Sequence, residues 1–315
     1  MLIQREDPKT AKTEILKCNV MNTDFHIEIE KNETDWKKAV LSFLHYMDRE
    51  FSRFRENNEL WRFNEARINS AIRVSPIFYD LLKKAETYRQ KTGGRFSPYL
   101  LSPLKAHGYS QTFPFTTAGH EEADFDYELQ SQPLLFQDNF LINKNTDQKI
   151  DLGGIAKGYA VEAIAQWLKR NIQSRYGLVD GGGDMAVWSN GEITWKIGIM
   201  NPFDETKTIG TFAIQNGGIA TSNIIYRSWK QGNQKKHHLL DGRTGMPVDT
   251  DIVQATVITQ HCLNSEIGAK LCFMADDMPL ASLLANISEK FRYVLVKSDG
   301  KIEIGGNVTD ARNAF

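Results

Sequence analysis

Apolar residues recur at helical spacing in three long segments of the chain. Apolar residues that are three or four positions apart lie on one side of a helix, which can pack on a core. Each segment is therefore predicted to form an amphipathic helix. The segments run from Trp36 to about Phe54, from Ser75-Pro76 to Gly93-Gly94, and from Ile155 to about Asn171. Early proline and closing glycines strengthen the second prediction. A shorter helix is predicted from Ser265 to about Ala275.

Other segments alternate apolar and polar residues, which is the period of a half-buried strand. Strands and hairpins are predicted at Val20–Glu30, through Phe136 and Phe140, and at 176–188, 195–199, 209–214, 219–224, 254–259 and 292–296 with 302–304. Because helices and hairpins are mixed, an α+β fold with mixed and antiparallel sheets is favoured over an alternating parallel sheet.

The order of these segments predicts a single domain, residues 20–315, after a polar N-terminal arm, residues 1–19. Residues 111–132 hold acidic residues and few aliphatic ones, and we expect an exposed insertion there. Residues 52–64 are polar but contain several aromatics. This segment fits either an ordered loop over a site or a packed connection.

Composition excludes several classes of protein. The 315 residues are 41% hydrophobic and 24% charged, as in soluble globular proteins, and a net charge of −1 gives no sign of a nucleic-acid partner. No stretch is apolar enough to span a membrane, and no signal peptide or lipid-anchor motif precedes Cys18. Three cysteines without metal-like spacing suit free thiols. The cytoplasm is the default location, although an exported protein trimmed of its leader would look the same.

The segment Asp151-Leu-Gly-Gly-Ile-Ala-Lys-Gly-Tyr-Ala-Val-Glu162 combines a glycine pair with the start of a helix. Glycines allow close backbone approach to a ligand, and the free N–H groups of a helix start favour an anion. Lys157 lies in the first turn, where the helix dipole disfavours a cation. A bound phosphate or flavin carbonyl would explain it. The alternative is an ordinary turn before an ordinary helix.

Two further glycine turns, at 181–183 and 242–245, also carry flanking aspartates, Asp184 and Asp241. Together the three turns could cradle a polyanionic ligand, although none fits a Rossmann or P-loop motif. Asp241–Gly245 could equally be a structural Asx turn in which Arg243 pairs outward. The adjacent His237 and His238 point apart on a strand, so at most one is expected near a site.

Glu266 and Lys270 are four residues apart and share a helix face. They form either a surface ion pair or part of a phosphate site.

Taken in order, several motifs resemble the FAD:protein FMN transferase family, known as ApbE. The resemblance runs from about Met21 to Met274, and Asp151–Glu162 is its best piece. It is supported by Met21-Asn-Thr23, Ser52–Asn64, Gly182-Gly183-Asp184, Ala220-Thr-Ser222 and His238–Pro247.

The resemblance implies a fold of the tunnelling type and an enzyme that splits the FAD pyrophosphate. FMN would pass to a Thr or Ser hydroxyl of an acceptor protein, AMP would leave, and Mg²⁺ would bind the pyrophosphate. By position it implies FAD contacts from Met21, Phe54, Arg95, Phe96, Ser97, Asp151, Lys157 and Leu240. It places Gly154, Glu266, Ala269 and Lys270 at the metal positions, and Asp184 and Lys270 in catalysis.

Three residues depart from the family pattern in ways that bear on activity. Ser97 and Glu266 stand where the family usually has Asp, and Lys270 stands where it usually has Thr. A protonated lysine cannot ligate Mg²⁺. Gly242 for Pro and Asn223 for Gly are lesser changes. The alternatives to transfer are therefore an FAD pyrophosphatase that releases FMN and AMP, and a non-catalytic FAD-binding protein.

Overall fold

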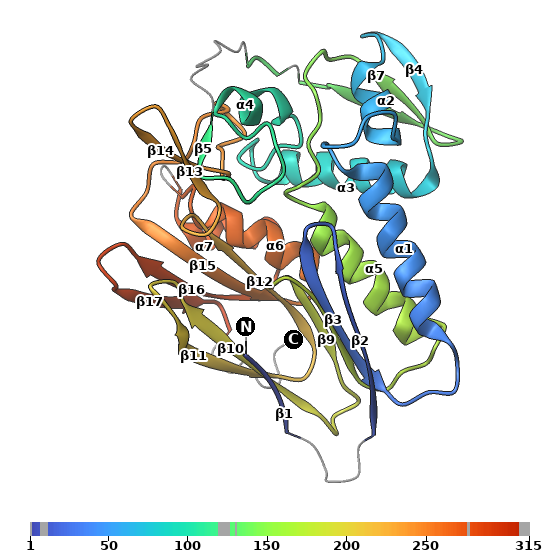
Figure 1. The fold of residues 1–315 in the computed structure, drawn as a ribbon, viewed down its shortest axis with the longest axis vertical. Coiled ribbons are helices and arrows are strands. Elements are labelled where there is room, and N and C mark those ends of the chain that lie inside the picture. Colours follow the sequence, from blue (N-terminus) through green and yellow to red (C-terminus); the bar gives the residue numbers. More distant parts are fainter. Residues whose placement is uncertain (1, 7–11, 119–126, 130, 276–277, 309–315) are drawn as a thin grey trace. The chain divides into compact units, whose positions relative to one another are not determined.

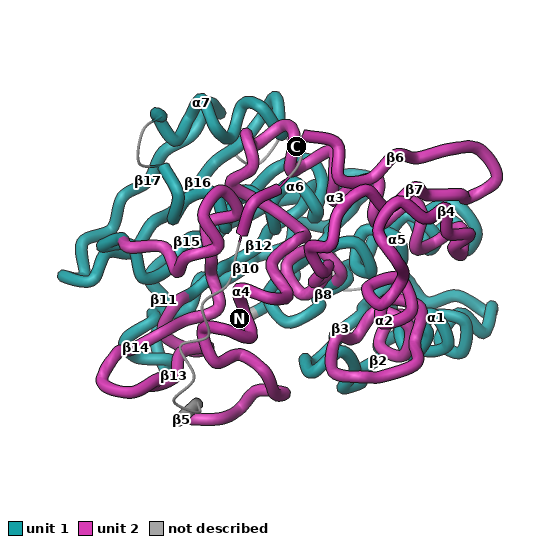
Figure 2. The backbone as a smooth tube through the Cα atoms, turned by 90° about the horizontal axis from the view of Figure 1, so that it is seen from above, with its two compact units in different colours: residues 1–46, 157–223, 250–315 teal, residues 47–156, 224–249 magenta. Residues whose placement is uncertain are grey.

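The computed structural model describes residues 2–6, 12–118, 127–129, 131–275 and 278–308. The chain divides into two compact units, each made of separate stretches of sequence (Figure 2). Unit 1 comprises residues 1–46, 157–223 and 250–315, and unit 2 comprises residues 47–156 and 224–249.

Unit 1 is built on an eight-stranded sheet in which every neighbouring pair is antiparallel (Figure 1). Its strand order is β17 (Ile302–Gly306), β16 (Phe291–Lys297), β15 (Ile252–Thr259), β12 (Gly217–Asn223), β9 (Met185–Trp188), β8 (Gly177–Gly181), β3 (Thr23–Glu30) and β2 (Thr13–Val20). The order is not the order of the sequence, so strands from both ends of the chain meet in one sheet.

One face of this sheet packs on a smaller antiparallel sheet of β1 (Leu2–Glu6), β10 (Thr194–Asn201) and β11 (Asp204–Ile214). Side chains of alternate residues from the two sheets meet in a buried core, as strand periodicity requires. The core includes Leu178, Val187, Ile219 and Ile258 from the large sheet, and Trp195, Ile197, Phe212 and Ile214 from the small one.

Helices cover the opposite face of the large sheet. α5 (Ala156–Arg170) lies against β8, where Val161 packs so closely on Gly181 that a side chain there would clash. α6 (Cys262–Leu271) packs on β12 and β15, followed by α7 (Leu280–Ala285). α1 (Trp36–Phe51) is tied to β2 by a hydrogen bond from Trp36 Nε1 to Glu14 Oε2.

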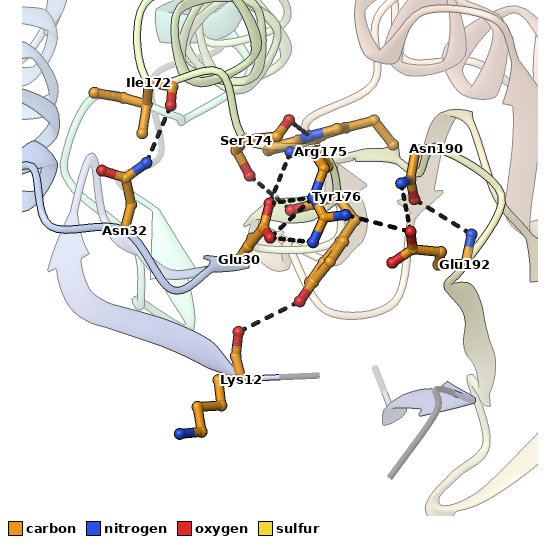
Figure 3. A network of polar contacts seen from close by, with 10 residues as sticks. Lys12, Glu30, Asn32, Ile172, Ser174, Arg175, Tyr176, Asn190 and Glu192 are labelled. Carbon is orange, nitrogen blue, oxygen red and sulfur yellow. Dashed lines mark hydrogen bonds and ion pairs between the residues drawn. The ribbon is translucent and has the colours of Figure 1, made fainter. Parts of the chain in front are cut away.

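A polar network holds the end of β3 to the loop before β8 (Figure 3). Arg175 pairs with Glu30 at 2.5 Å and with Glu192 at 3.3 Å, and Asn32 donates to the Ile172 carbonyl. The Arg175 side chain is 54% exposed, so these pairs fix the loop locally and contribute little to stability.

Unit 2 contains α2 (Glu59–Glu65), α3 (Pro76–Lys91), α4 (Leu101–Ala106) and two small sheets. One sheet is β4 (Ser70–Arg73), β7 (Leu141–Lys144) and β6 (Leu134–Gln137), and the other is β14 (Gln234–His237), β13 (Ser228–Gln231) and β5 (Thr117–Ala118). β5 and β13 are parallel. Leu104, Tyr109, Trp229 and Leu240 form a buried cluster.

The predicted α+β fold with antiparallel sheets and packed helices is confirmed, as are the three long helices and the hairpins. Within the segment assigned to a polar arm, residues 2–6 form β1, which pairs with the distant β10, and residues 13–20 form β2, which makes a hairpin with β3. α2 begins within residues 52–64, which were expected to form an ordered loop or a packed connection, and α4 was not predicted. Residues 119–126 and 130 of the predicted insertion lie outside the described residues.

The helix predicted from Ser265 to Ala275 begins at Cys262 and ends at Leu271. The three cysteines are free thiols, as predicted. Within the described ranges, no helix has both the length and the apolar character needed to cross a bilayer.

Candidate functional site

The Asp151 motif folds as a turn followed by a helix. Asp151 Oδ1 accepts the Gly153 N–H at 3.0 Å, and the Ala156 N–H donates to the Leu152 carbonyl at 2.8 Å. α5 begins at Ala156, so Lys157 occupies its first turn. The turn itself belongs to unit 2, whereas the helix from Lys157 onward belongs to unit 1.

Within unit 2, Asp151 is paired with Arg53, a residue that the sequence analysis did not single out. Arg53 Nη1 lies 3.3 Å from Asp151 Oδ2, and its guanidinium lies over the rings of Phe54 at 4.6 Å and Tyr109 at 4.0 Å. Phe54 remains 40% exposed. The available signal was an arginine set among the aromatics of residues 52–64.

Four charged side chains of unit 1 converge, and we call Lys157, Asp184, Glu266 and Lys270 the charged cluster. Lys157 Nζ pairs directly with Asp184 Oδ2. Glu266 Oε1 lies 3.6 Å from Lys157 Nζ and 3.2 Å from Lys270 Nζ. The cluster therefore joins the first turn of α5, the turn between β8 and β9, and α6.

The acidic groups of the charged cluster are buried, and its basic groups reach the surface. Glu266 and Asp184 side chains are 1% and 5% exposed, against 18% for Lys157 and 14% for Lys270. Burial raises the pKa of Glu266, and the adjacent Lys270 ammonium opposes that shift. With all four groups ionised, the cluster is neutral overall, and its two positive charges are on the more exposed side chains.

The start of α5 is capped by the protein's own carboxylate. The Gly158 N–H donates to Glu266 Oε2 at 3.0 Å, and a β-carbon at residue 158 would force that carboxylate to move. In return, Glu162 of α5 accepts the Cys262 N–H at 2.8 Å at the start of α6. We call these two contacts the reciprocal carboxylate caps. The Glu266–Lys270 pair is accordingly not a surface ion pair.

Met21 and Asn22 form the turn between β2 and β3, with φ values of 57° and 55°. Methionine is strained in this left-handed conformation, and strain of this kind is concentrated at functional sites. Phe25 of β3 pairs with Gly181 of β8, so the turn lies at the same end of the sheet as residues 182–184. The turn and the charged cluster thus share one end of unit 1.

In unit 2, two departures from the family pattern are linked by Tyr127. Tyr127 OH donates to the Gly242 carbonyl at 2.8 Å and lies 3.1 Å from Ser97 Oγ. The Gly242 N–H donates to the Arg95 carbonyl at 2.8 Å, a bond that proline could not make. Ser97 and Gly242 are therefore parts of one arrangement.

The Asp241–Gly245 segment forms an Asx turn that also holds the Arg243 side chain. Asp241 Oδ1 accepts the Arg243 N–H at 2.8 Å, and the two side chains form an ion pair at 2.5 Å. His237 and His238 each contact a backbone carbonyl through a ring nitrogen. Leu240 is buried and bridges to Pro247.

The predicted site residues are divided between the two units. Unit 1 holds Met21, Lys157, Asp184, Glu266, Ala269 and Lys270. Unit 2 holds Phe54, Arg95, Phe96, Ser97, Asp151, Gly154 and Leu240. Arg95, Phe96 and Ala269 are buried. Within unit 1, the structure brings together Lys157, Asp184, Glu266 and Lys270; Arg53 and Tyr127 were missed.

Proteins with similar sequences include several named FAD:protein FMN transferase. The chain is 24% identical to the FAD:protein FMN transferase of Escherichia coli K12 over 278 residues, covering 83% of this chain and 79% of that protein. It is 27% identical to the FAD:protein FMN transferase of Chlamydia pneumoniae over 284 residues, covering 85% and 86%.

Solved structures show the same fold. The ApbE protein of Thermotoga maritima superposes with a TM-score of 0.79 at 23% identity, covering 93% of this chain and 96% of that one. The flavin transferase ApbE of Vibrio cholerae gives 0.73 at 19% identity, covering 94% and 97%. The ApbE family pattern matches residues 21–295, which is most of the sequence. The chain therefore belongs to the ApbE family.

Proposed function

We propose that this chain is an FAD:protein FMN transferase. It breaks the bond between the two phosphates of FAD, joins the FMN phosphorus to a Thr or Ser hydroxyl oxygen of an acceptor protein, and releases AMP. The observation that carries the proposal is the direct pairing of Lys157 with Asp184, in a chain that belongs to the ApbE family. Lys157 and Asp184 come from two separate motifs, Asp151–Glu162 and Gly182–Asp184, which the family resemblance assigned to one site.

The charged cluster supplies what phosphoryl transfer needs from a protein. Transfer depends on holding the phosphates in line and on neutralising charge that develops on their oxygens. Lys157 and Lys270 would supply ammonium groups for that purpose, and the buried carboxylates paired with them fix their positions. Met21, Phe54, Arg95, Phe96, Ser97, Asp151 and Leu240 stay proposed FAD contacts.

Asp184 is the proposed general base. Its carboxylate would accept the proton of the attacking hydroxyl, so that the oxygen can form its bond to phosphorus as AMP leaves. The Lys157 ammonium holds this carboxylate in one orientation. A base fixed in this way removes one source of disorder from the reacting groups.

The family resemblance also implies Mg²⁺, with Gly154, Glu266, Ala269 and Lys270 at its site. Glu266 Oε1 is a buried oxygen that receives no regular hydrogen bond, which is the kind of atom a cation seeks. Two cations already face it, namely the ammonium groups of Lys157 and Lys270. A divalent ion there would add two charges to a neutral group, so these residues do not fit Mg²⁺.

A flavinylation assay tests the proposal. Purified protein is mixed with FAD and a candidate acceptor protein, flavin fluorescence of the acceptor is read in a denaturing gel, and AMP is measured chromatographically. We expect a fluorescent acceptor and an equal amount of AMP. An acceptor whose target Thr or Ser is changed to Ala should show neither.

Variants and products separate the alternatives. Asp184→Asn should lower transfer by roughly 10²–10⁴-fold while FAD binding persists, as expected for loss of a general base. Free FMN and AMP without labelled acceptor would instead show a pyrophosphatase. Tight FAD binding with no product would show a non-catalytic binding protein.

A further inference from the structure

Lys270 is largely buried and is paired with the buried Glu266 carboxylate, unlike an ordinary surface lysine. We propose that Lys270 supplies, from within the chain, the positive charge that holds the FAD diphosphate, so that FAD binding and FMN transfer require no divalent metal ion. The inference rests on the proposed function and specifies how its site meets the phosphates.

The count of charges supports this assignment. Glu266 and Asp184 contribute two negative charges, and Lys157 and Lys270 contribute two positive charges at contact distance. A divalent cation beside the same carboxylates would supply the same two charges. Lysine and metal are therefore alternatives at this place, because both together would leave an excess of positive charge in a largely buried group.

Two contacts with Glu266 fix the position of the Lys270 ammonium group. Lys270 Nζ lies 3.2 Å from Glu266 Oε1 and donates to the Glu266 carbonyl oxygen, also at 3.2 Å. An ammonium group has three N–H donors; one binds the carbonyl oxygen and the paired carboxylate can take at most one more, so at least one is left for a phosphate oxygen. The side chain is 14% exposed, which leaves a ligand access from solvent without freeing the nitrogen from its carboxylate.

The other oxygen of Glu266 is also committed. Oε2 accepts the Gly158 N–H and forms part of the reciprocal carboxylate caps. A metal ion on Glu266 would have to displace an ammonium group from Oε1 or break the cap at Oε2. The structure favours the simpler outcome, in which Glu266 positions Lys270 and Lys270 meets the ligand.

FAD affinity in the presence and absence of metal gives the first test. FAD is titrated against the intact protein by flavin fluorescence, once with excess EDTA and once with millimolar Mg²⁺. We expect dissociation constants within about twofold of each other, since no metal contact contributes. Transfer to the acceptor is measured in the same two buffers and should also be equal.

Variants at residue 270 give the second test. Lys270→Thr should weaken FAD binding in EDTA by about tenfold or more, the usual effect of losing a charged donor, and Mg²⁺ should restore part of it. Lys270→Arg keeps the charge and should bind FAD in EDTA. Lys169→Thr, on the exposed end of α5, is the matched control and should resemble the unchanged protein. Thermal melting confirms that each variant is folded.

Three results would overturn the inference. The first is an unchanged protein that binds FAD or transfers FMN only with Mg²⁺. The second is a folded Lys270→Thr variant that binds FAD normally in EDTA. The third is a Lys270→Thr variant whose response to Mg²⁺ matches that of the unchanged protein. If the proposed function is wrong, neither labelled acceptor nor AMP forms in either buffer. The FAD-binding measurements still decide the role of Lys270 in that case.

Discussion

Gly158 decides how closely α5 can approach Glu266 of α6. In most helices alanine in place of glycine stabilises by about 1 kcal/mol. Here the added methyl would push the Glu266 carboxylate away and break its bond to the residue-158 N–H. We predict that Gly158→Ala destabilises the protein by about 1–3 kcal/mol, measured by chemical denaturation.

Gly210→Ala is the matched control for this substitution. An added β-carbon at Gly210 meets nothing within 4 Å, so the free energy of unfolding should change little. If Gly158→Ala proved neutral or stabilising, Glu266 would not be held where the structure has it.

Asp180 gives unit 1 a pH dependence. Burial raises the pKa of Asp180 from 3.8 to about 6, against the opposing effect of a hydrogen bond from the Gly183 N–H. A raised pKa means that the stability linked to this group is present below pH 3.8 and is lost as pH rises through 6. The loss at pH 8 is on the order of 3 kcal/mol.

We predict that Asp180→Asn removes this loss, because the amide oxygen still accepts the Gly183 N–H and never ionises. The variant should gain stability relative to the unchanged protein between pH 4 and pH 8, by roughly 3 kcal/mol in urea unfolding. Parallel pH profiles for the two proteins would contradict the assignment.

At the scale of elements, the reciprocal carboxylate caps tie α5 to α6. Burial acts to raise the pKa of Glu162, but hydrogen bonds from His261, Gln166 and the Cys262 N–H bring it below its usual 4.5. The hydrogen bond to Glu162 raises the pKa of His261 above 6.5. The carboxylate contributes stability above pH 4.5 and loses it as pH falls; the imidazolium contributes below pH 6.5 and loses it as pH rises.

Glu162→Gln should therefore destabilise the protein most between pH 4.5 and 6.5, where both partners are charged. Thermal melting across pH 4 to 9 measures this. His261→Gln is the matched control, since it removes the ion pair but leaves the cap on the Cys262 N–H. If Glu162→Gln lowered the melting temperature by the same amount at every pH, the ion pair between Glu162 and His261 would not be the cause.

Elements differ in how far sequence could predict them. α1, α3 and α5 have three or more turns, so their apolar faces repeat often enough to be recognised. α2 has seven residues, and its carbonyl end is held by Lys144 Nζ, which donates to Asn64 and Ala66 oxygens at 2.9 Å each. Such support comes from a residue some 80 positions away and leaves no periodic signal.

In the candidate site too, local motifs could be predicted from sequence, whereas contacts between distant residues could not. The motifs that contain Lys157, Asp184 and Glu266 could be recognised separately, and the helical spacing of Glu266 and Lys270 could be predicted. Their meeting depends on β8, β9, β12 and α6 packing in a given order, which local pattern does not encode. Tyr127 was missed because its role depends on contacts with Ser97 and Gly242.

At the scale of the whole molecule, the chain passes between the units four times, so neither unit is one continuous segment. Residues 47–156 lack Trp229 and Leu240, which complete the buried cluster around Leu104 and Tyr109. We predict that fragment 47–156 alone does not fold cooperatively, as judged by circular dichroism and thermal melting. The same fragment joined by a flexible linker to residues 224–249 should recover a cooperative transition; equal behaviour of the two would contradict the prediction.

The pairing of Phe25 with Gly181 has a consequence for biosynthesis. When β2 and β3 leave the ribosome, the strand that completes their edge has not yet been translated, and β15 follows much later still. An open strand edge invites association with other chains, and distant pairings form slowly. The β2–β3 hairpin therefore keeps an open edge until residues 177–181 have emerged, and the far side of the sheet is built only when β15, β16 and β17 follow.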